Sequence, residues 1–391
     1  MNLPSNNAKI YLGKSADGQP ISASYTDLMA QHLLVVGQTG SGKSTSLKQV
    51  ISQLQGHDLT NIIFDPTGEY GQDLPNCITY TIGQNAFVDV TNQDARQLLV
   101  LWDLDWPDFL VEKLQSAIVS LRIQNMNYPN QAKILNKLNL KISQYQAWQR
   151  QLALFGHDYP VHLLAEQLIQ EFVVPFANNQ ADYSYLGQEL DHQAIRQYWP
   201  QILALQELLG HPVSSRIFHL CQPNGQVIQY DLSFILSKFE NSLNQKRSLV
   251  LNLSNLQSYP HIQQNVISLL MDQILYQRIN STCRRPVAIV IDEAHRYLPV
   301  NQPLAQSGIF HLLREGRKFG LNLLMSTQSS LDIPAQLRGQ FHTWLVHNLQ
   351  TKEEVEHLPS SANFDQLKVG QAVLFRQNNQ SQIINIQQFN R

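Results

Sequence analysis

One loop restricts this 391-residue chain more than any other feature of its sequence. The loop, Gly37-Gln38-Thr39-Gly40-Ser41-Gly42-Lys43-Ser44, lies between the apolar run 33–36 and a segment with helical spacing, 44–54. A G-x-x-x-x-G-K-[ST] pattern between a strand and a helix is typical of a phosphate-binding loop. Backbone N–H groups cradle phosphates there, while Lys43 adds a charge and Ser44 an oxygen for Mg²⁺. The sequence therefore predicts a nucleoside triphosphate ligand, ATP with Mg²⁺.

The residues expected to contact the nucleotide all belong to this loop and the first turn of its helix. They are Gly37, Thr39, Gly40, Ser41, Gly42, Lys43, Ser44 and Thr45.

Composition limits the class of protein. A hydrophobic content of 43% is enough for a sizeable core, and a formal net charge of −2 gives no overall basic signature for nucleic acid. Three widely separated cysteines without C-x-x-C spacing argue against a zinc site and for a reducing compartment. No signal peptide is visible in residues 1–14, and no apolar run approaches the ~20 residues needed to span a bilayer. We expect a soluble cytoplasmic protein without membrane contact.

The order of the apolar segments predicts an α/β fold with a mainly parallel central sheet. After the loop helix, the run Asn61–Asp65 reads as a strand, and strand, helix, strand at this spacing indicates a right-handed βαβ unit. Two β-like pieces in 9–25, around a turn signal, predict a short N-terminal hairpin. Further strands are expected at 248–253, 287–291, 321–326, 341–347, 371–375 and 381–387, and helices at 261–280 and 309–319.

The middle of the chain has a different sequence pattern, which is typical of helices. Leucine-rich segments with helical periodicity, broken by prolines, run through it at 108–123, 131–154, 161–172 and 194–209. We therefore expect a hairpin arm at 1–30, an ATPase core at 31–92 and 246–391, and a large helical insertion at 93–245.

A second motif, Ala288-Ile289-Val290-Ile291-Asp292-Glu293, is an apolar strand that ends in two adjacent acids. Together with a phosphate-binding loop upstream, this arrangement predicts that Asp292 holds Mg²⁺. Glu293 would then orient or deprotonate the water that attacks the γ-phosphate. The pair predicts hydrolysis in addition to binding.

A third motif, Leu313–Gly320, is basic and precedes the strand that leads to Gln328. Its arginines either complement a helix dipole or act on a neighbouring subunit's γ-phosphate as an arginine finger. Gln328, at the carboxyl end of an inner strand, either senses the γ-phosphate or is a hydrogen-bonded strand terminus.

Four ordered segments together resemble the HerA branch of the HerA/FtsK ATPases. They are 37–44, 63–70, 291–299 and 315–320, and the resemblance covers about 9–92 and 248–387. It implies a RecA-like ring ATPase, usually a hexamer, that moves double-stranded DNA through a central channel and works with a nuclease or other effector.

The resemblance also implies roles for single residues. Arg317, with Arg314 in reserve, would be the finger that acts on the neighbouring subunit. Asp65 would lie near the metal or the attacking water, with an N-cap of the following turn as the alternative. Lys43, Ser44, Glu293 and Gln328 would keep the roles given above.

Two departures from the family pattern concern the periphery. Relatives usually carry a small β-barrel ahead of the core, where only about 30 residues precede the loop strand here, and Thr67 stands where His is common. The barrel helps to hold the ring and the nuclease in the family, so its absence bears on partner docking and leaves the chemistry unaffected.

The leading functional hypothesis is a ring ATPase that translocates on or unwinds duplex DNA, in end processing or anti-phage defence. The alternatives are a scaffold or regulatory ATPase that activates a partner effector, and a conjugation or secretion ATPase. A DNA channel needs inward-facing basic residues, and the loop 300–308 could face it. The basic candidates, each also readable as an ordinary surface charge, are Lys246, Arg247, Arg284, Arg285, Arg296, Lys318 and Arg338.

Overall fold

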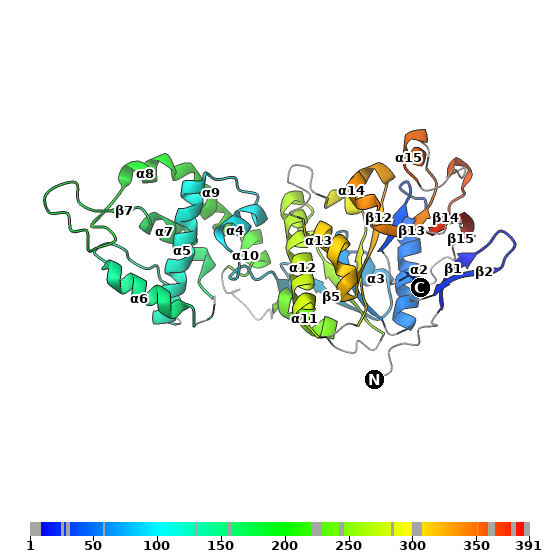
Figure 1. Cartoon of the computed structure of the whole chain (residues 1–391), viewed down its shortest axis with the longest axis horizontal. Helices are drawn as coiled ribbons and strands as arrows, with labels where there is room; N and C mark the ends of the chain where they lie inside the picture. Colours follow the sequence, from blue (N-terminus) through cyan, green and yellow to red (C-terminus); the bar gives the residue numbers. More distant parts are fainter. Residues whose placement is uncertain are drawn as a thin grey trace. The chain divides into compact units, whose positions relative to one another are not determined.

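The computed structural model divides the chain into two compact units (Figure 1), one of residues 1–82 and 233–391 and the other of residues 83–232. The residues that it describes are 9–24, 27–28, 32–57, 59–129, 131–154, 156, 158–220, 229–241, 246–282, 285–298, 307–349, 351–358, 364–376 and 381–386. Arg284 and most of the loop 300–308 lie outside these ranges.

The first unit is built on a sheet of 11 described strands, in the order β2-β1-β15-β14-β13-β3-β12-β11-β4-β10-β5. The strands from β13 through β5 pair in parallel, and the remaining pairs are antiparallel. The bounds are β1 Lys9–Lys14, β2 Pro20–Ser24, β3 His32–Val36, β4 Thr60–Asp65, β5 Cys77–Thr81, β10 Ser248–Asn252, β11 Val287–Ile291, β12 Leu321–Thr327, β13 Phe341–Val346, β14 Gln371–Arg376 and β15 Ser381–Asn385. The predicted α/β fold, with a mainly parallel sheet and an N-terminal hairpin, is confirmed.

Helices cover this sheet and connect its parallel strands, as βαβ units require. The helices are α2 Lys43–Gly56, α3 Tyr70–Asp73, α11 Leu232–Asn241, α12 Pro260–Asn280, α13 Gly308–Glu315, α14 Ala335–Arg338 and α15 Lys352–Glu356. Short 3₁₀ turns are η2 Ser254–Leu256, η3 Ala294–Arg296, η5 Gly316–Phe319, η6 Ser330–Asp332 and η7 Phe364–Gln366. The predicted helix 309–319 thus ends at Glu315, and its last residues form η5.

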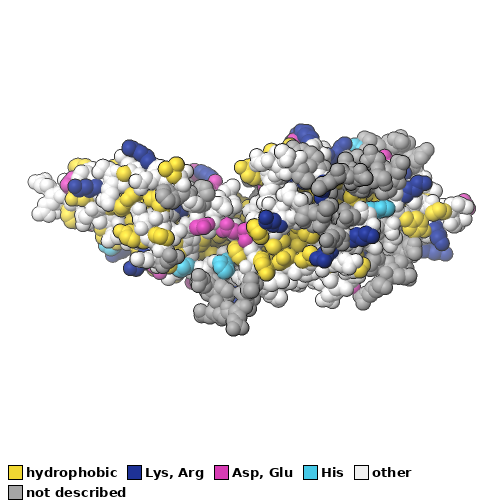
Figure 2. Space-filling view, turned by 90° about the horizontal axis from the view of Figure 1, so that it is seen from below, with side chains coloured by type: hydrophobic (Ala, Val, Ile, Leu, Met, Phe, Trp, Pro, Cys, Tyr) yellow, Lys and Arg dark blue, Asp and Glu magenta, His cyan; other side chains and the backbone are white. Residues whose placement is uncertain are grey.

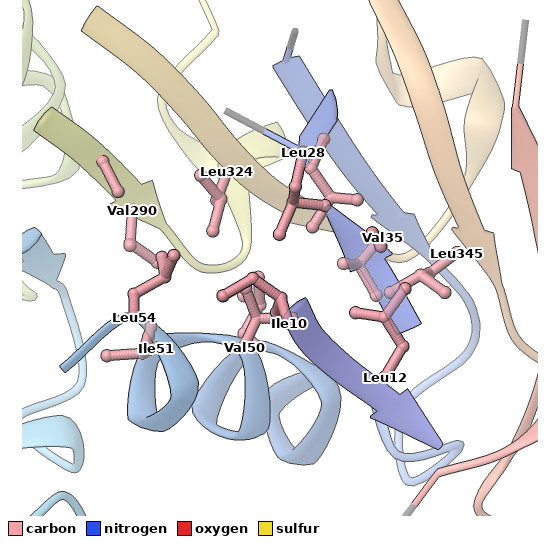
Figure 3. Packing of buried hydrophobic residues seen from close by; sticks show 14 of the residues in the cluster. Ile10, Leu12, Leu28, Val35, Val50, Ile51, Leu54, Val290, Leu324 and Leu345 are labelled. Atoms are coloured by element: carbon pink, nitrogen blue, oxygen red, sulfur yellow. The ribbon is translucent and has the colours of Figure 1, made fainter. Parts of the chain in front are cut away.

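The core of the unit lies between α2 and one face of the sheet. Figure 3 shows Val50, Ile51 and Leu54 of α2 directed toward the sheet, where Val290 and Leu324 of β11 and β12 lie. All five side chains are buried. Every residue of β3, β4, β11 and β12 is buried too, which explains why these strands read as continuous apolar runs.

The strand order determines where a ligand site can form. Because β3, β12, β11 and β4 are parallel neighbours, the residues that follow them reach the same edge of the sheet. That edge, at the carboxyl ends of the strands, is where open α/β sheets bind ligands. Gly37, Gln328, Asp292 and Asp65 all lie there.

The surface of α11 and α12 is partly apolar. Phe234, Tyr276 and Ile279 are 55%, 70% and 46% exposed. Figure 2 shows hydrophobic side chains gathered on the face of this unit that is seen from below, with Lys and Arg side chains beside them.

The second unit is largely helical. Its elements are β6 Ala86–Phe87, α4 Ala95–Leu101, α5 Asp108–Asn127, α6 Ile142–Leu152, η1 Val161–Leu163, α7 Leu164–Gln170, β7 Val173–Val174, β8 Glu189–Leu190, α8 His192–Gln197, α9 Trp199–Gly210, α10 Pro212–Ile217 and β9 Tyr230–Asp231. Among the helices that the structure describes, none is both long and apolar enough to cross a membrane.

The prediction of a helix over 131–154 is wrong in its first half, because the helix begins only at Ile142. The backbone of Leu135 is bonded to a distant side chain: its N–H donates to Gln167 Oε1 at 2.6 Å, and Gln167 Nε2 donates to its carbonyl at 3.1 Å. Asn139 has a left-handed φ of 57°. The apolar spacing of 131–141 therefore resembled that of a helix, although this segment is irregular and is held by hydrogen bonds to a distant side chain.

Candidate active site

The loop between β3 and α2 has the backbone of an anion cradle. Gly42, the residue before α2, has φ 108° and ψ 11°, a left-handed conformation that a side chain would disfavour. A Cβ on Gly37 would lie 2.5 Å from His347 Cβ, so only glycine fits there. The chain consequently turns directly into the N-terminus of α2, where backbone N–H groups and the helix dipole favour phosphate.

Lys43 is the first residue of α2 and is only 4% exposed. Its Nζ donates to the carbonyl of Gln38 at 3.1 Å and lies 3.9 Å from Glu293 Oε1. Burial lowers the pKa of Lys43, and the nearby carboxylates of Glu293 and Asp292 oppose that shift. The loop therefore holds an ammonium group between its own backbone and the two acids that follow β11.

Asp292 is the centre of the hydrogen-bond network. Its Oδ2 accepts from Ser44 Oγ at 2.9 Å and from Tyr70 Oη at 2.8 Å. Its Oδ1 accepts from Ser326 Oγ and from the N–H of Glu293, the latter at 3.0 Å. Four donors from four parts of the chain therefore fix this carboxylate at the carboxyl edge of the sheet.

The contact between Ser44 and Asp292 bears on the expected metal. A hydroxyl oxygen and a carboxylate, 2.9 Å apart, are hard oxygen ligands of the kind that Mg²⁺ takes, and Mg²⁺ commonly uses few protein ligands beside phosphate and water. The donor set thus fits Mg²⁺. Within the described ranges, no group of three or more His, Cys, Asp or Glu side chains is arranged to hold a metal ion.

Glu293 has a left-handed backbone, with φ 52° and ψ 45°. Its N–H donates to Asp292 Oδ1 and, at 3.1 Å, to Ser326 Oγ. Its Oε2 accepts from Gln328 Nε2 at 3.1 Å and lies 3.4 Å from His295 Nδ1. The carboxylate of Glu293 is therefore oriented by Gln328, the residue that follows β12.

A pocket of about 470 Å³ adjoins these groups. It is lined by Gln38, Thr39, His295, Gln328, Ser329, Asp332 and Glu354. Since Thr39 belongs to the phosphate-binding loop and Gln328 contacts Glu293, the pocket lies beside both the loop and the Glu293 carboxylate.

Asp65 is fully buried at the end of β4, and its recorded hydrogen bonds go to the turn that follows. Its Oδ1 accepts from the N–H of Gly68 at 2.8 Å and from Thr67, and its Oδ2 accepts from the N–H of Tyr70 at 2.9 Å. These contacts match the capping alternative that the sequence left open. A role near the metal or the attacking water stays a prediction.

The two arginines of the third motif lie away from this edge. Arg317 is exposed and precedes β12, whereas Gln328 follows it. The seven residues of β12 span about 20 Å, so Arg317 stands at the opposite end of the strand. Arg314 is exposed too, with its guanidinium 5.2 Å from the centre of the Phe310 ring. Neither belongs to the site of its own chain, and action on a neighbouring subunit stays a prediction.

Two of the basic residues considered for DNA contact have local partners. Lys318 pairs with Glu315 at 2.7 Å, and Arg338 Nε donates to the carbonyl of Ile333 at 2.8 Å. These contacts agree with the surface-charge alternative and leave the channel lining a prediction.

Sequence reasoning did not identify Tyr70, Ser326 or His295 as members of the site. Tyr70 and Asp292 are 222 residues apart, so no local spacing reveals their contact. The available signal was topological: Tyr70 and Ser326 lie at the carboxyl ends of β4 and β12, the two strands that flank β11.

Comparison with known proteins finds a curated relative. The HerA helicase of DNA double-strand break repair from Saccharolobus solfataricus is 25% identical over 366 residues, which are 88% of this chain and 61% of that protein. This chain therefore spans about 61% of the length of that curated relative.

Two solved structures share the fold. VirB4 of Thermoanaerobacter pseudethanolicus matches with a TM-score of 0.64 and 14% identity, over 99% of this chain and 98% of that one. The plasmid coupling protein TrwB, in complex with ADP and Mg²⁺, matches with a TM-score of 0.54 and 13% identity, over 97% and 90%.

A family comparison covers more than half of the chain. Residues 10–274 match the family described as the central domain of helicase HerA. This region includes the phosphate-binding loop, Asp65 and Tyr70, and extends into α12. The chain belongs to the HerA helicase central-domain family.

Proposed function

We propose that this protein is a Mg²⁺-dependent ATP hydrolase that assembles as a ring, with a hexamer as the expected form. The ring would translocate on or unwind double-stranded DNA, together with a nuclease or other effector, in DNA end processing or anti-phage defence. The observation that carries the proposal is the contact of Ser44 with Asp292 at 2.9 Å, beside a Glu293 carboxylate oriented by Gln328.

The chemistry follows from the positions of these groups. The loop N–H groups and Lys43 would bind the phosphates, and Mg²⁺ at Ser44 and Asp292 would neutralise their charge. Glu293 would accept a proton from the water whose oxygen attacks the γ-phosphorus. The bond from that phosphorus to the bridging oxygen then breaks, and ADP and phosphate leave.

A charge on the γ-phosphate would be stabilised by Arg317 of a neighbouring subunit, with Arg314 in reserve. The support is positional, since Arg317 is exposed at the amino end of β12 while the phosphate-binding loop lies at the carboxyl end of the sheet. One chain therefore does not bring its own finger to its own site.

The proposed substrate, duplex DNA, is supported by the name of the curated relative, a DNA double-strand break repair helicase.

We also propose that the predicted insertion, 93–245, corresponds to the helical unit of residues 83–232 and interrupts the ATPase core.

The first test compares ATP hydrolysis with and without duplex DNA in wild type and Glu293→Gln. We expect DNA to raise the wild-type rate and the substitution to lower turnover by about 10²-fold to 10⁴-fold, since it removes the general base. Nucleotide binding should persist. Glu356→Gln, which changes an exposed carboxylate of α15, is the matched control and should hydrolyse ATP like wild type.

The second test mixes two inactive variants, Glu293→Gln and Arg317→Ala, in a series of ratios. A finger that acts between subunits predicts partial recovery, because a mixed interface combines an intact carboxylate with an intact arginine. No recovery at any ratio would contradict the shared site. An ATPase rate that ignores DNA but changes when an effector protein is added would instead favour the scaffold alternative.

A further inference from the structure

Tyr70 is 1% exposed, and its hydroxyl donates to Asp292 Oδ2 at 2.8 Å, the same oxygen that Ser44 contacts. We propose that Tyr70 is a positioning residue for the magnesium site, which orients the Asp292 carboxylate toward the ion. The inference rests on the proposed function, because it concerns the metal that the function requires.

The chain fixes the backbone of Tyr70 before its side chain reaches Asp292. Asp65 Oδ2 accepts the N–H of Tyr70 at 2.9 Å, and Asp65 Oδ1 accepts the N–H of Gly68 at 2.8 Å. The turn after β4 is therefore tied to the strand end. This gives Asp65 a role through Tyr70.

The ring of Tyr70 is held from another side by α2. Lys48 Nζ lies 5.0 Å from the ring centre, a cation–π distance, and pairs with Asp73 at 2.6 Å. Lys48 is five residues after Lys43, so the helix that begins at the phosphate-binding loop also restrains the tyrosine. The helix α2 and the turn after β4 thus converge on one phenol.

The hydroxyl of Tyr70 is suited to donating. A phenol ordinarily titrates near pH ~10, so its hydroxyl is protonated at neutral pH and can donate. A donor that orients a metal-binding carboxylate commonly changes metal affinity by about 10-fold to 100-fold when it is removed.

The test is Tyr70→Phe, which keeps the ring, its packing and its contact with Lys48 but removes the donor. The measurement is equilibrium binding of a fluorescent non-hydrolysable ATP analogue during a Mg²⁺ titration of the full chain. We expect the Mg²⁺ concentration at half-maximal binding to rise about tenfold. Binding of the analogue in EDTA should equal that of wild type.

Tyr297→Phe is the matched control. Tyr297 is also buried, at 2% exposure, and its hydroxyl has no hydrogen-bond partner among the described residues. Its removal should leave the Mg²⁺ titration unchanged. If the Mg²⁺ titration of Tyr70→Phe matches those of wild type and of Tyr297→Phe, the inference is overturned. The proposed function would still stand.

Two further measurements separate a positioning role from a structural one. In an Asp292→Asn background, Tyr70→Phe should add less than about a twofold further change, because the effects of groups that act through one contact are not additive. If the two substitutions raise the Mg²⁺ concentration at half-maximal binding by independent factors that multiply, the inference is overturned. A wild-type protein that binds the analogue equally with and without Mg²⁺ overturns the proposed function, and this inference with it.

Discussion

Glu293, the proposed general base, has a backbone conformation that few residues other than glycine adopt. Its φ of 52° is stabilised by two hydrogen bonds from its N–H, to Asp292 and Ser326. A non-glycine residue in this backbone region costs about 1–3 kcal/mol of folding free energy. Such a conformation is kept only where the surrounding structure holds it. Hydrogen bonds from its N–H therefore hold the proposed base in a backbone conformation that is itself unfavourable.

Replacing Glu293 by glycine should separate stability from activity. Glu293→Gly relieves the left-handed strain, so we expect thermal unfolding at or above the wild-type temperature although hydrolysis is lost. The control is Glu356→Gly in α15, which should lower stability by roughly 1 kcal/mol because glycine weakens a helix. Differential scanning calorimetry measures both. A large drop for Glu293→Gly would show that the carboxylate contributes more to folding than the strain costs.

At the scale of elements, His32 ties β3 to its neighbours. Its Nε2 donates to the carbonyl of Leu313 in α13, and its Nδ1 accepts from the N–H of Leu323 in β12, both at 2.9 Å. This pattern requires the neutral imidazole, because a protonated Nδ1 would face a donor. Burial lowers the pKa of His32 to about 4, assisted by the Arg317 charge.

The His32 contacts predict a loss of stability in mild acid. The folded pKa is about 4 and the unfolded value about 6.5, so the unfolded chain binds more protons between them. The contribution of His32 is complete above pH 6.5 and declines as the pH falls toward 4. Its upper bound is about 3 kcal/mol.

Thermal unfolding at pH 7, 6 and 5 checks this. The unfolding temperature of wild type should fall with pH, and that of His32→Gln should fall less. Some slope should remain in the variant, because burial also lowers the pKa of His347 to about 4. Parallel curves for the two proteins would contradict the assignment.

Buried central strands could be predicted from the sequence, whereas an edge strand and an irregular segment could not. The strands β3, β4, β11 and β12 are buried on both faces and were visible as apolar runs beside recognisable motifs. The edge strand β5, Cys77–Thr81, was missed because its residues are all half-buried and mixed in character. The segment 131–141 was mistaken for helix, since its partner Gln167 lies 32 residues away.

The candidate site divides in the same way. The motifs in the loop and after β11 identified Lys43, Ser44, Asp292 and Glu293 as candidates, because each motif is a run of consecutive residues. The donor Tyr70 could not be found by spacing, because only the order of strands brings it to Asp292.

At the scale of the whole molecule, a site shared between subunits should make activity depend on assembly. If Arg317 serves a neighbour, ATP turnover per chain rises with protein concentration through the range in which rings form. Arg317→Ala should stay slow throughout. Mass photometry on the same samples relates rate to particle size. Constant turnover per chain among monomers would contradict the proposal.

The placement of Arg317 and the phosphate-binding loop at opposite ends of β12 has a geometric consequence. If Arg317 serves the site of a neighbouring subunit, as we propose, the copies of the chain would join head to tail. Such contacts are heterologous, and they close into a cyclic array or continue as a helix. Every subunit interface would then have the same orientation. ATP turnover that passes from one interface to the next would therefore proceed in one rotational direction.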